Sequence, residues 1–180
     1  MEFITIFFQL LTLDFQAFVI SLNQIPIIIT WIIFLFLCLI TILIMLKLFG
    51  KEGIYIYTAI AIIVANIQVL KIIEFPFFDK PIALGTILFS STFLATDVLT
   101  EYYGARFAKR NILIGFVSFL IMTIFMLFTL GFTPVDAKDI NDEYAWALTI
   151  QENLSGIFMP FPIFFLASMI AYLTSQYFDV

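Results

Sequence analysis

The chain has 180 residues, of which 63% are apolar and only 12% are charged, and its mean hydropathy is +1.14. A soluble domain is about 45–50% apolar and about 25% charged, so this composition excludes a water-soluble monomer, whose surface would be one continuous apolar patch. The absence of histidine excludes serine-histidine-acid triads and histidine-ligated zinc sites, and the net charge of −5 argues against nucleic acid as a partner.

The first 24 residues form an apolar segment with a narrow polar stripe. Polar side chains recur every seven positions, at Glu2, Gln9, Gln16 and Asn23. On a helix of 3.6 residues per turn this spacing places them on one side. The segment has neither the basic start nor the small-residue cleavage site of a signal peptide. We therefore predict that residues 1–24 are retained as a helix that either lies in the membrane interface or spans the membrane.

Five later stretches are apolar and long enough to cross a lipid bilayer, whose core requires about 20 apolar residues per helix. They are residues 25–45, 54–73, 82–100, 112–132 and 156–176. The first of them contains no charged side chain. We predict an all-α fold, a polytopic transmembrane helix bundle over residues 25–180 with five spans and a possible sixth at the N-terminus.

Basic residues gather in two of the predicted turns. Lys47 and Lys51 flank the turn after the first stretch. Arg106, Lys109 and Arg110 crowd the turn after the third. Both turns lie on the same side of the membrane in this topology, and the positive-inside rule makes that side cytoplasmic. The acidic loop before the last stretch then lies outside, and the C-terminus lies inside.

The second stretch contains the segment ANIQVLK, which carries three polar side chains. Gln68 and Lys71 share a helical face, whereas Asn66 points away from both, so this helix is expected to meet two neighbours. The amides either contact a ligand or join helices to one another. Lys71 either faces a site or snorkels outward and pairs with Glu74.

The third stretch carries a polar stripe. Its members are Thr86, Ser90, Asp97 and Glu101, spaced four, seven and four residues apart. At 100° per residue they fall within about 60° of one helical face, and because polar groups are costly in lipid we predict that this face turns inward. Asp97 and Glu101 are like charges one turn apart, so either a cation lies between them or one carboxyl takes up a proton. The alternative is that both lie at the cytoplasmic end, within reach of headgroup water or Arg106.

The last stretch has a second polar stripe behind two prolines. Its members are Ser168, Tyr172, Ser175 and Asp179. Pro160 and Pro162 either kink this helix or break it and expose backbone groups, as at transport sites. Among the aromatic residues, Trp31 and Tyr57 are the candidates for stacking on a planar ligand.

Four segments of the chain resemble the queuosine precursor transporter family, whose members are also called vitamin uptake transporters. The segments are FGKEGIYIY at 49–57, ANIQVLK at 65–71, SSTFLATDVLTEYYG at 90–104 and IAYLTSQYFDV at 170–180. The resemblance covers residues 48–180 and is most specific in the mutual spacing of Thr96, Asp97, Glu101, Tyr103 and Gly104. The first 24 residues show no such resemblance.

The resemblance implies import of a 7-deazaguanine, either a precursor base or queuine, across the inner membrane of a bacterium that uses it to modify tRNA. A guanine-like edge offers adjacent N–H donors that one carboxylate matches and an oxo acceptor that an amide satisfies. Asp97, Asn66 and Gln68 supply these groups. The candidate substrate-binding residues are Asn66, Gln68, Lys71, Thr86, Ser90, Thr96, Asp97 and Glu101. We expect no cofactor and no metal, and the repelling carboxylates suggest coupling to protons.

Members of the family run on into a basic cytoplasmic loop and a further spanning helix, whereas this sequence stops at Val180. We therefore expect a C-terminal helix to be lacking. Two alternatives stay open: a substrate-capturing component that depends on a separate energising partner, since no nucleotide-binding P-loop is present, and a truncated, non-functional remnant. A homo-oligomer is a further arrangement left open. A membrane enzyme is the least expected class, because the carboxylates have no histidine, metal-ligand cluster or nucleophile beside them.

Overall fold

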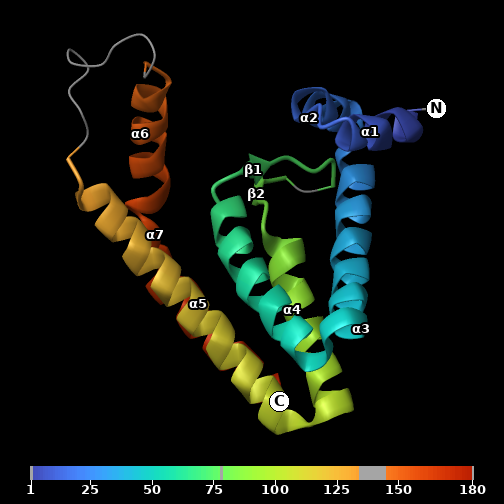
Figure 1. The fold of residues 1–180 in the computed structure, drawn as a ribbon, viewed down its shortest axis with the longest axis vertical. Helices are drawn as coiled ribbons and strands as arrows, with labels where there is room; N and C mark the ends of the chain where they lie inside the picture. Colours follow the sequence, from blue (N-terminus) through green and yellow to red (C-terminus); the bar gives the residue numbers. More distant parts are fainter. Residues whose placement is uncertain (1, 78, 134–144, 180) are drawn as a thin grey trace.

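The computed structural model describes residues 2–77, 79–133 and 145–179, and the described chain is mostly helical, as predicted. Most of the acidic loop falls outside these residues. The elements in chain order are α1 (Glu2–Leu11), α2 (Phe15–Gln24), α3 (Ile27–Gln68), β1 (Ile72–Ile73), β2 (Ile82–Ala83), α4 (Thr86–Tyr103), α5 (Ala105–Gly131), α6 (Ala145–Phe158) and α7 (Phe161–Asp179). Figure 1 shows them as a set of long helices with two short helices laid across one end.

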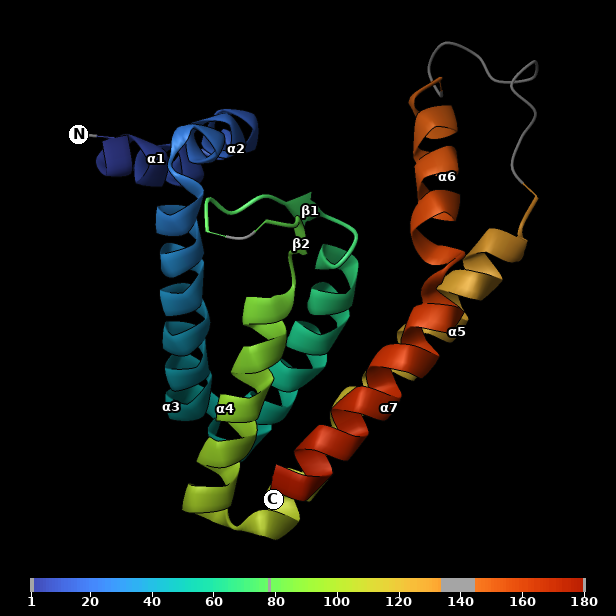
Figure 2. The same ribbon diagram turned by 180° about the vertical axis from the view of Figure 1, so that it is seen from behind.

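Helix α3 is a helical hairpin and not one rod. Its backbone leaves the helical conformation at Gly50, where φ is 60° and ψ is −139°, a combination that glycine adopts readily because it has no Cβ. The chain reverses direction there, so the first half of α3 (27–49) and the second half (51–68) lie antiparallel (Figures 1 and 2). The two halves correspond to the first two predicted spans.

The turn at Gly50 and the turn at Gly104 lie at the same end of the bundle, as predicted. A Cβ on Gly50 would lie 3.4 Å from the Tyr103 hydroxyl, and the Lys51 ammonium lies 4.5 Å from the centre of the Phe107 ring. We call this the turn end. The opposite end, which carries α1, α2, β1 and β2, is the hairpin end (Figure 2).

The count of five spans is not confirmed. Within the described residues two helices, α3 and α5, are long and apolar enough to cross a membrane, and a third span results if the bent pair of α6 and α7 is counted as one. Helix α4 occupies the third predicted stretch, but Asp97 and Glu101 make it less apolar than α3 and α5. It is therefore not among the helices that are long and apolar enough to cross a membrane. The predicted helix 156–176 is wrong as a single rod, because α6 ends at Phe158 and the segments 150–163 and 167–178 are bent by 51° relative to each other. Pro160 lies between α6 and α7 and Pro162 in the first turn of α7, just before this bend, and each lacks a backbone donor.

The second and third predicted spans extend too far at the hairpin end. The second half of α3 ends at Gln68 and α4 begins at Thr86. Between them β1 and β2 form a short antiparallel pair, in which Ile72 faces Ala83. Pro76 and Pro81 lie in the connecting loop, and the residue before a proline is disfavoured in the α conformation. The predicted fold therefore lacked this small hairpin.

The N-terminal segment forms two helices where one was predicted. Each has ten residues and is about 15 Å long, about half the thickness of a bilayer core, so neither spans alone. Leu13, with a φ of 61°, separates them. The Asp14 carboxylate then caps α2 by accepting a hydrogen bond from the Ala17 amide at 3.1 Å. Because the helix is interrupted, the polar stripe of residues 2–23 is not continuous.

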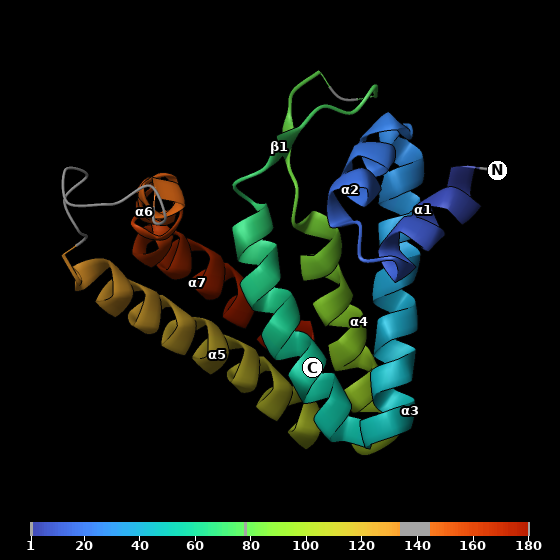
Figure 3. The same cartoon turned by 45° about the horizontal axis from the view of Figure 1, so that its top comes forward.

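Two apolar cores flank the second half of α3 and α4, which lie in the middle of the bundle (Figures 1 and 3). The first core joins them to the first half of α3 and includes Cys38, Ile42, Ile54, Ala61, Ala95 and Leu99. The second core joins them to α5 and α7 and includes Ile62, Ile112, Phe119, Phe161, Met169 and Tyr172. Phe89 of α4 packs against both cores.

Candidate functional site

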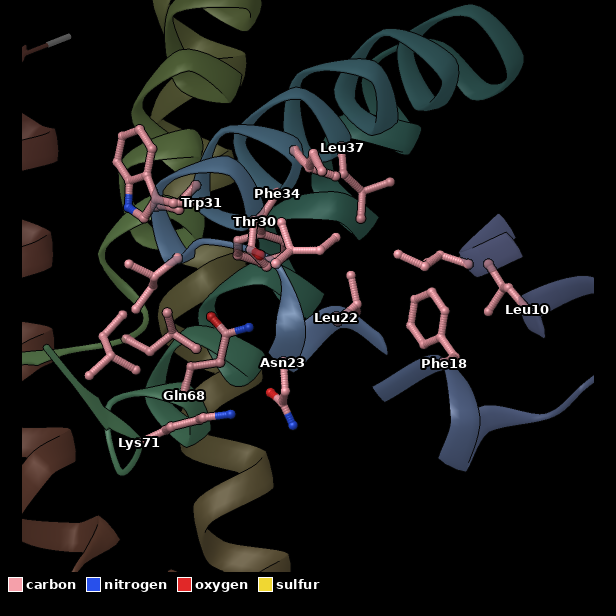
Figure 4. A pocket seen from close by; sticks show the side chains of 17 residues that line it. Leu10, Phe18, Leu22, Asn23, Thr30, Trp31, Phe34, Leu37, Gln68 and Lys71 are labelled. Carbon is pink, nitrogen blue, oxygen red and sulfur yellow. The ribbon is translucent and has the colours of Figure 1, made fainter. Parts of the chain in front are cut away.

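A cavity of about 580 Å³ opens at the hairpin end. Helices α1 and α2 form one wall, and the first half of α3 forms a second (Figure 4). The third wall consists of the end of α3, β1, Leu84 just after β2, and the start of α4. Its lining residues are largely apolar, and Phe18, Trp31 and Phe34 contribute aromatic rings. The volume lies within the range of about 300–1,000 Å³ that small-molecule sites occupy. We call it the hairpin-end cavity.

A small set of polar side chains reaches into this cavity. Gln68, the last residue of α3, and Lys71, just before β1, extend toward Thr30 and Asn23 (Figure 4). The Thr30 hydroxyl oxygen and the Gln68 amide oxygen are buried and make no hydrogen bond within the described chain. An unsatisfied buried polar atom costs about 1–3 kcal/mol. A ligand with N–H or O–H donors would remove that cost, so these two oxygens mark where a polar ligand would bind.

Gln68 also lines a second, deeper cavity of about 240 Å³. The two cavities share Phe34, Leu37 and Gln68, and the deeper one continues between the halves of α3 to Cys38 and Tyr57. The Tyr57 hydroxyl is hydrogen-bonded to the Ser91 hydroxyl of α4 at 2.5 Å. Gln68 therefore stands at the junction of the two spaces.

Below the deeper cavity the halves of α3 come together. Met45 lines the cavity, and a Cβ placed on Gly53 would lie only 2.1 Å from the Met45 carbonyl oxygen. Ile42 and Ile54 are buried beside this contact. The space thus opens at the hairpin end and closes toward the turn end.

Two of the eight candidate site residues, Gln68 and Lys71, meet in the hairpin-end cavity. Asn66 faces the other way, as predicted: its amide donates to the Ile62 carbonyl at 2.8 Å and its oxygen accepts from the Ser168 hydroxyl at 3.2 Å. It therefore joins α3 to α7, which is the helix-joining use of a membrane amide. Of the predicted stripe in the last stretch, Ser168 is thus a partner of α3, and Tyr172 is buried.

Thr96 is buried within α4. It donates to the Thr92 carbonyl at 3.0 Å and accepts from the Asn111 amide of α5 at 3.5 Å. The bond from Asn111 joins α5 to α4, whereas the bond to Thr92 stays within α4. Thr96 does not line either cavity described above.

The polar stripe of α4 does share one face, but that face is exposed. Its members are Thr86, Ser90, Asp97 and Glu101. The prediction that it packs into the bundle is wrong for the described chain, because α4 packs through its other side, where small residues such as Ser91, Ala95 and Thr96 are buried. Small residues let helix backbones approach closely. A role of the exposed stripe in substrate binding stays a prediction.

Sequence reasoning missed Thr30 and Asn23 as cavity residues. Thr30 interrupts a run of apolar residues, which is a weak signal on its own. Asn23 belonged to the N-terminal polar stripe, but nothing in its spacing indicates that α2 folds back over α3.

Trp31, a predicted stacking residue, does line the cavity. The predicted loop residues Asp136, Lys138, Asp139, Asp142 and Glu143 lie outside the described residues.

Comparison with known proteins agrees with the resemblance found in the sequence. Residues 83–180 match the family described as "Putative vitamin uptake transporter". The "Probable queuosine precursor transporter" of Bacillus subtilis (strain 168) is 35% identical to this chain over 150 residues, which make up 83% of this chain and 60% of that protein. The chain thus spans less than two thirds of that relative's length. No solved structure matches the chain. By its apolar helices and these two matches, the chain is a membrane protein that belongs to the vitamin uptake transporter family.

Proposed function

We propose that this chain imports a queuosine precursor, a 7-deazaguanine base or queuine, and that the hairpin-end cavity receives the substrate. The observation that carries the proposal is the pair of unsatisfied oxygens of Thr30 and Gln68 inside an otherwise apolar cavity of about 580 Å³, in a chain related to a queuosine precursor transporter. A neutral heterocycle needs such a site, with apolar walls for its ring and few polar groups for its edge.

The chemistry of the cavity suits the edge of a guanine-like ring. The Gln68 amide has both an acceptor and a donor, so it matches a ring N–H on one side and an oxo group on the other. Lys71 offers a further donor to the oxo group. Trp31 and Phe34 bring aromatic rings to the wall, and planar ligands stack favourably on such rings.

The orientation in this proposal follows the basic residues. Lys51, Arg106, Lys109 and Arg110 lie at the turn end, which the positive-inside rule places in the cytoplasm of a bacterial cell. The C-terminus of α7 lies at the same end (Figure 2). The hairpin end and its cavity then face outward from the inner membrane, as import requires.

The test is uptake in cells that cannot make the precursor. Such cells express the chain, receive an external precursor, and are assayed for queuosine in their tRNA. We expect modified tRNA with the wild-type chain and little with Gln68→Met, which keeps the size of the side chain and removes its polar atoms. Gln24→Met is the matched control, because Gln24 is exposed and outside the cavity. Absence of modified tRNA with an inserted wild-type chain contradicts the proposal.

A second variant tests the exposed stripe of α4. We propose that Asp97 contributes the carboxylate that matches the adjacent N–H donors of a guanine-like edge. Asp97→Asn keeps the shape of the side chain and removes its charge. Loss of uptake with Gln68→Met but not with Asp97→Asn would confine substrate recognition to the hairpin-end cavity. Loss of uptake with both variants would show that the exposed stripe of α4 also takes part in substrate recognition.

A further inference from the structure

Four neutral polar side chains are buried where the second half of α3, α5 and α7 meet, and most of their polar atoms lack a partner among the described residues. Thr58, Asn111, Tyr172 and Gln176 are each 0% exposed. Five of their atoms make no hydrogen bond within the described chain: Thr58 Oγ1, Asn111 Oδ1, Tyr172 Oη, Gln176 Oε1 and Gln176 Nε2. We call this group the buried polar cluster.

The members of the cluster lie within about one helical turn of each other. A Cβ placed on Gly115 would lie next to Ile62 Cδ1, 3.0 Å from Tyr172 Oη and 3.4 Å from the Thr58 methyl Cγ2, so the side chains of Tyr172 and Thr58 both approach Gly115. Asn111 precedes Gly115 by four residues and Gln176 follows Tyr172 by four. Helix α7 runs back along α5 (Figures 1 and 2), so both amides lie one turn, about 5.4 Å, nearer the turn end.

The cluster also lies deep in the membrane. Thr58 is eight residues beyond Gly50, which at 1.5 Å per residue is about 12 Å from the turn, near the middle of a bilayer core about 30 Å thick. Polar groups at that depth are costly and mark ion or substrate sites in membrane proteins. Coupling-ion sites of transporters lie near the midplane for the same reason.

The missing partners are a property of these particular side chains. Other buried threonines satisfy their hydroxyl within their own helix: Thr92, Thr96 and Thr123 donate to backbone carbonyls at 2.7, 3.0 and 2.9 Å. Thr58 does not. Each unsatisfied atom costs about 1–3 kcal/mol, and apolar side chains of the same shape would avoid that cost. The cluster is therefore poorly suited to packing alone.

The chemistry of the cluster selects a small cation. Four of its five unsatisfied atoms are oxygens, none belongs to a charged group, and sites for divalent cations rely on carboxylates that the cluster does not contain. Neutral carbonyl and hydroxyl oxygens replace the hydration shell of a monovalent cation in membrane sites. We propose that the buried polar cluster binds Na⁺, with one water molecule accepting from Gln176 Nε2.

The test measures binding without any substrate, so its failure leaves the proposed import standing. Thermal unfolding of the purified full chain is followed in detergent, in sodium chloride and in choline chloride at equal ionic strength. A cation that binds only the folded chain at 100 times its Kd raises the unfolding midpoint of a chain this size by about 5 °C or more. An equal midpoint in both salts overturns the proposal.

Two variants that conserve shape separate ion binding from packing. Tyr172→Phe and Thr58→Val each remove one unsatisfied oxygen and leave the apolar contacts in place. We expect both to keep or raise the midpoint in choline chloride and to lose the sodium-dependent rise. Ser175→Ala is the control, because the Ser175 hydroxyl bonds the Ala171 carbonyl of its own helix at 2.8 Å, and it should keep that rise. A full sodium response in both variants, or an equal loss of stability in both salts, overturns the proposal.

Discussion

Replacing Gly53 by alanine tests the close contact between the halves of α3. The new Cβ would lie 2.1 Å from the Met45 carbonyl oxygen and 3.0 Å from Phe49 Cβ, whereas real Cβ contacts are essentially never under 3.0 Å. The halves must therefore separate by about 0.9 Å, which disturbs the core around Ile42 and Ile54. Overpacking of this kind costs about 1–3 kcal/mol.

The matched control is Gly156→Ala in α6, where a Cβ would have nothing within 4 Å. An exposed helical glycine replaced by alanine gains about 0.5–1 kcal/mol. Thermal unfolding of both purified variants in detergent should therefore show a lower midpoint for Gly53→Ala than for wild type and an equal or higher midpoint for Gly156→Ala. If Gly53→Ala unfolds at or above the wild-type midpoint, the contact between the halves of α3 is not as close as described.

Two further predictions concern the deeper cavity and the link between α3 and α7. Cys38 is the single cysteine of the chain and lines the deeper cavity, so bound precursor should slow the reaction of its thiol with N-ethylmaleimide. The Cys38→Ser variant gives the background labelling, and an equal labelling rate with and without precursor would place the substrate elsewhere. Ser168→Ala removes the 3.2 Å hydrogen bond to the Asn66 oxygen and leaves that oxygen without this donor, so the free energy of unfolding should fall by about 1–3 kcal/mol. An unchanged unfolding midpoint would show that this bond does not hold α3 and α7 together.

The sequence predicted the class of the fold because composition and charge decide it. Long apolar runs are stable as helices in lipid, and the alternation of spans predicts that the two basic turns lie at one end. The approach of the Tyr103 hydroxyl to Gly50 confirms that these two turns lie together. The helix limits at the hairpin end were wrong because Ile72, Ile73 and Ile82 are as apolar as the helices beside them. Only the backbone pairing of β1 and β2 distinguishes them.

The site was predicted only where its residues lie close together in the sequence. Gln68 and Lys71 are three residues apart and both line the cavity, although α3 ends at Gln68 and Lys71 lies beyond it, so the predicted common helical face is wrong. Asn23 and Thr30 approach them because α2 folds over α3, a contact that no local spacing encodes. For α4 the spacing correctly grouped the polar stripe on one face, but it could not decide which face packs. The small residues on the opposite face decide that, since they allow closer approach.

The most direct test of the account is uptake of labelled precursor by liposomes that contain this chain and no other protein. The account predicts uptake that unlabelled precursor competes away and that Gln68→Met lowers about tenfold or more, since the loss of two hydrogen bonds to the ligand at about 1 kcal/mol each changes affinity by that amount. Absence of uptake with bound precursor would point to a capture component that needs an energising partner. Neither uptake nor binding by correctly inserted protein would contradict the account.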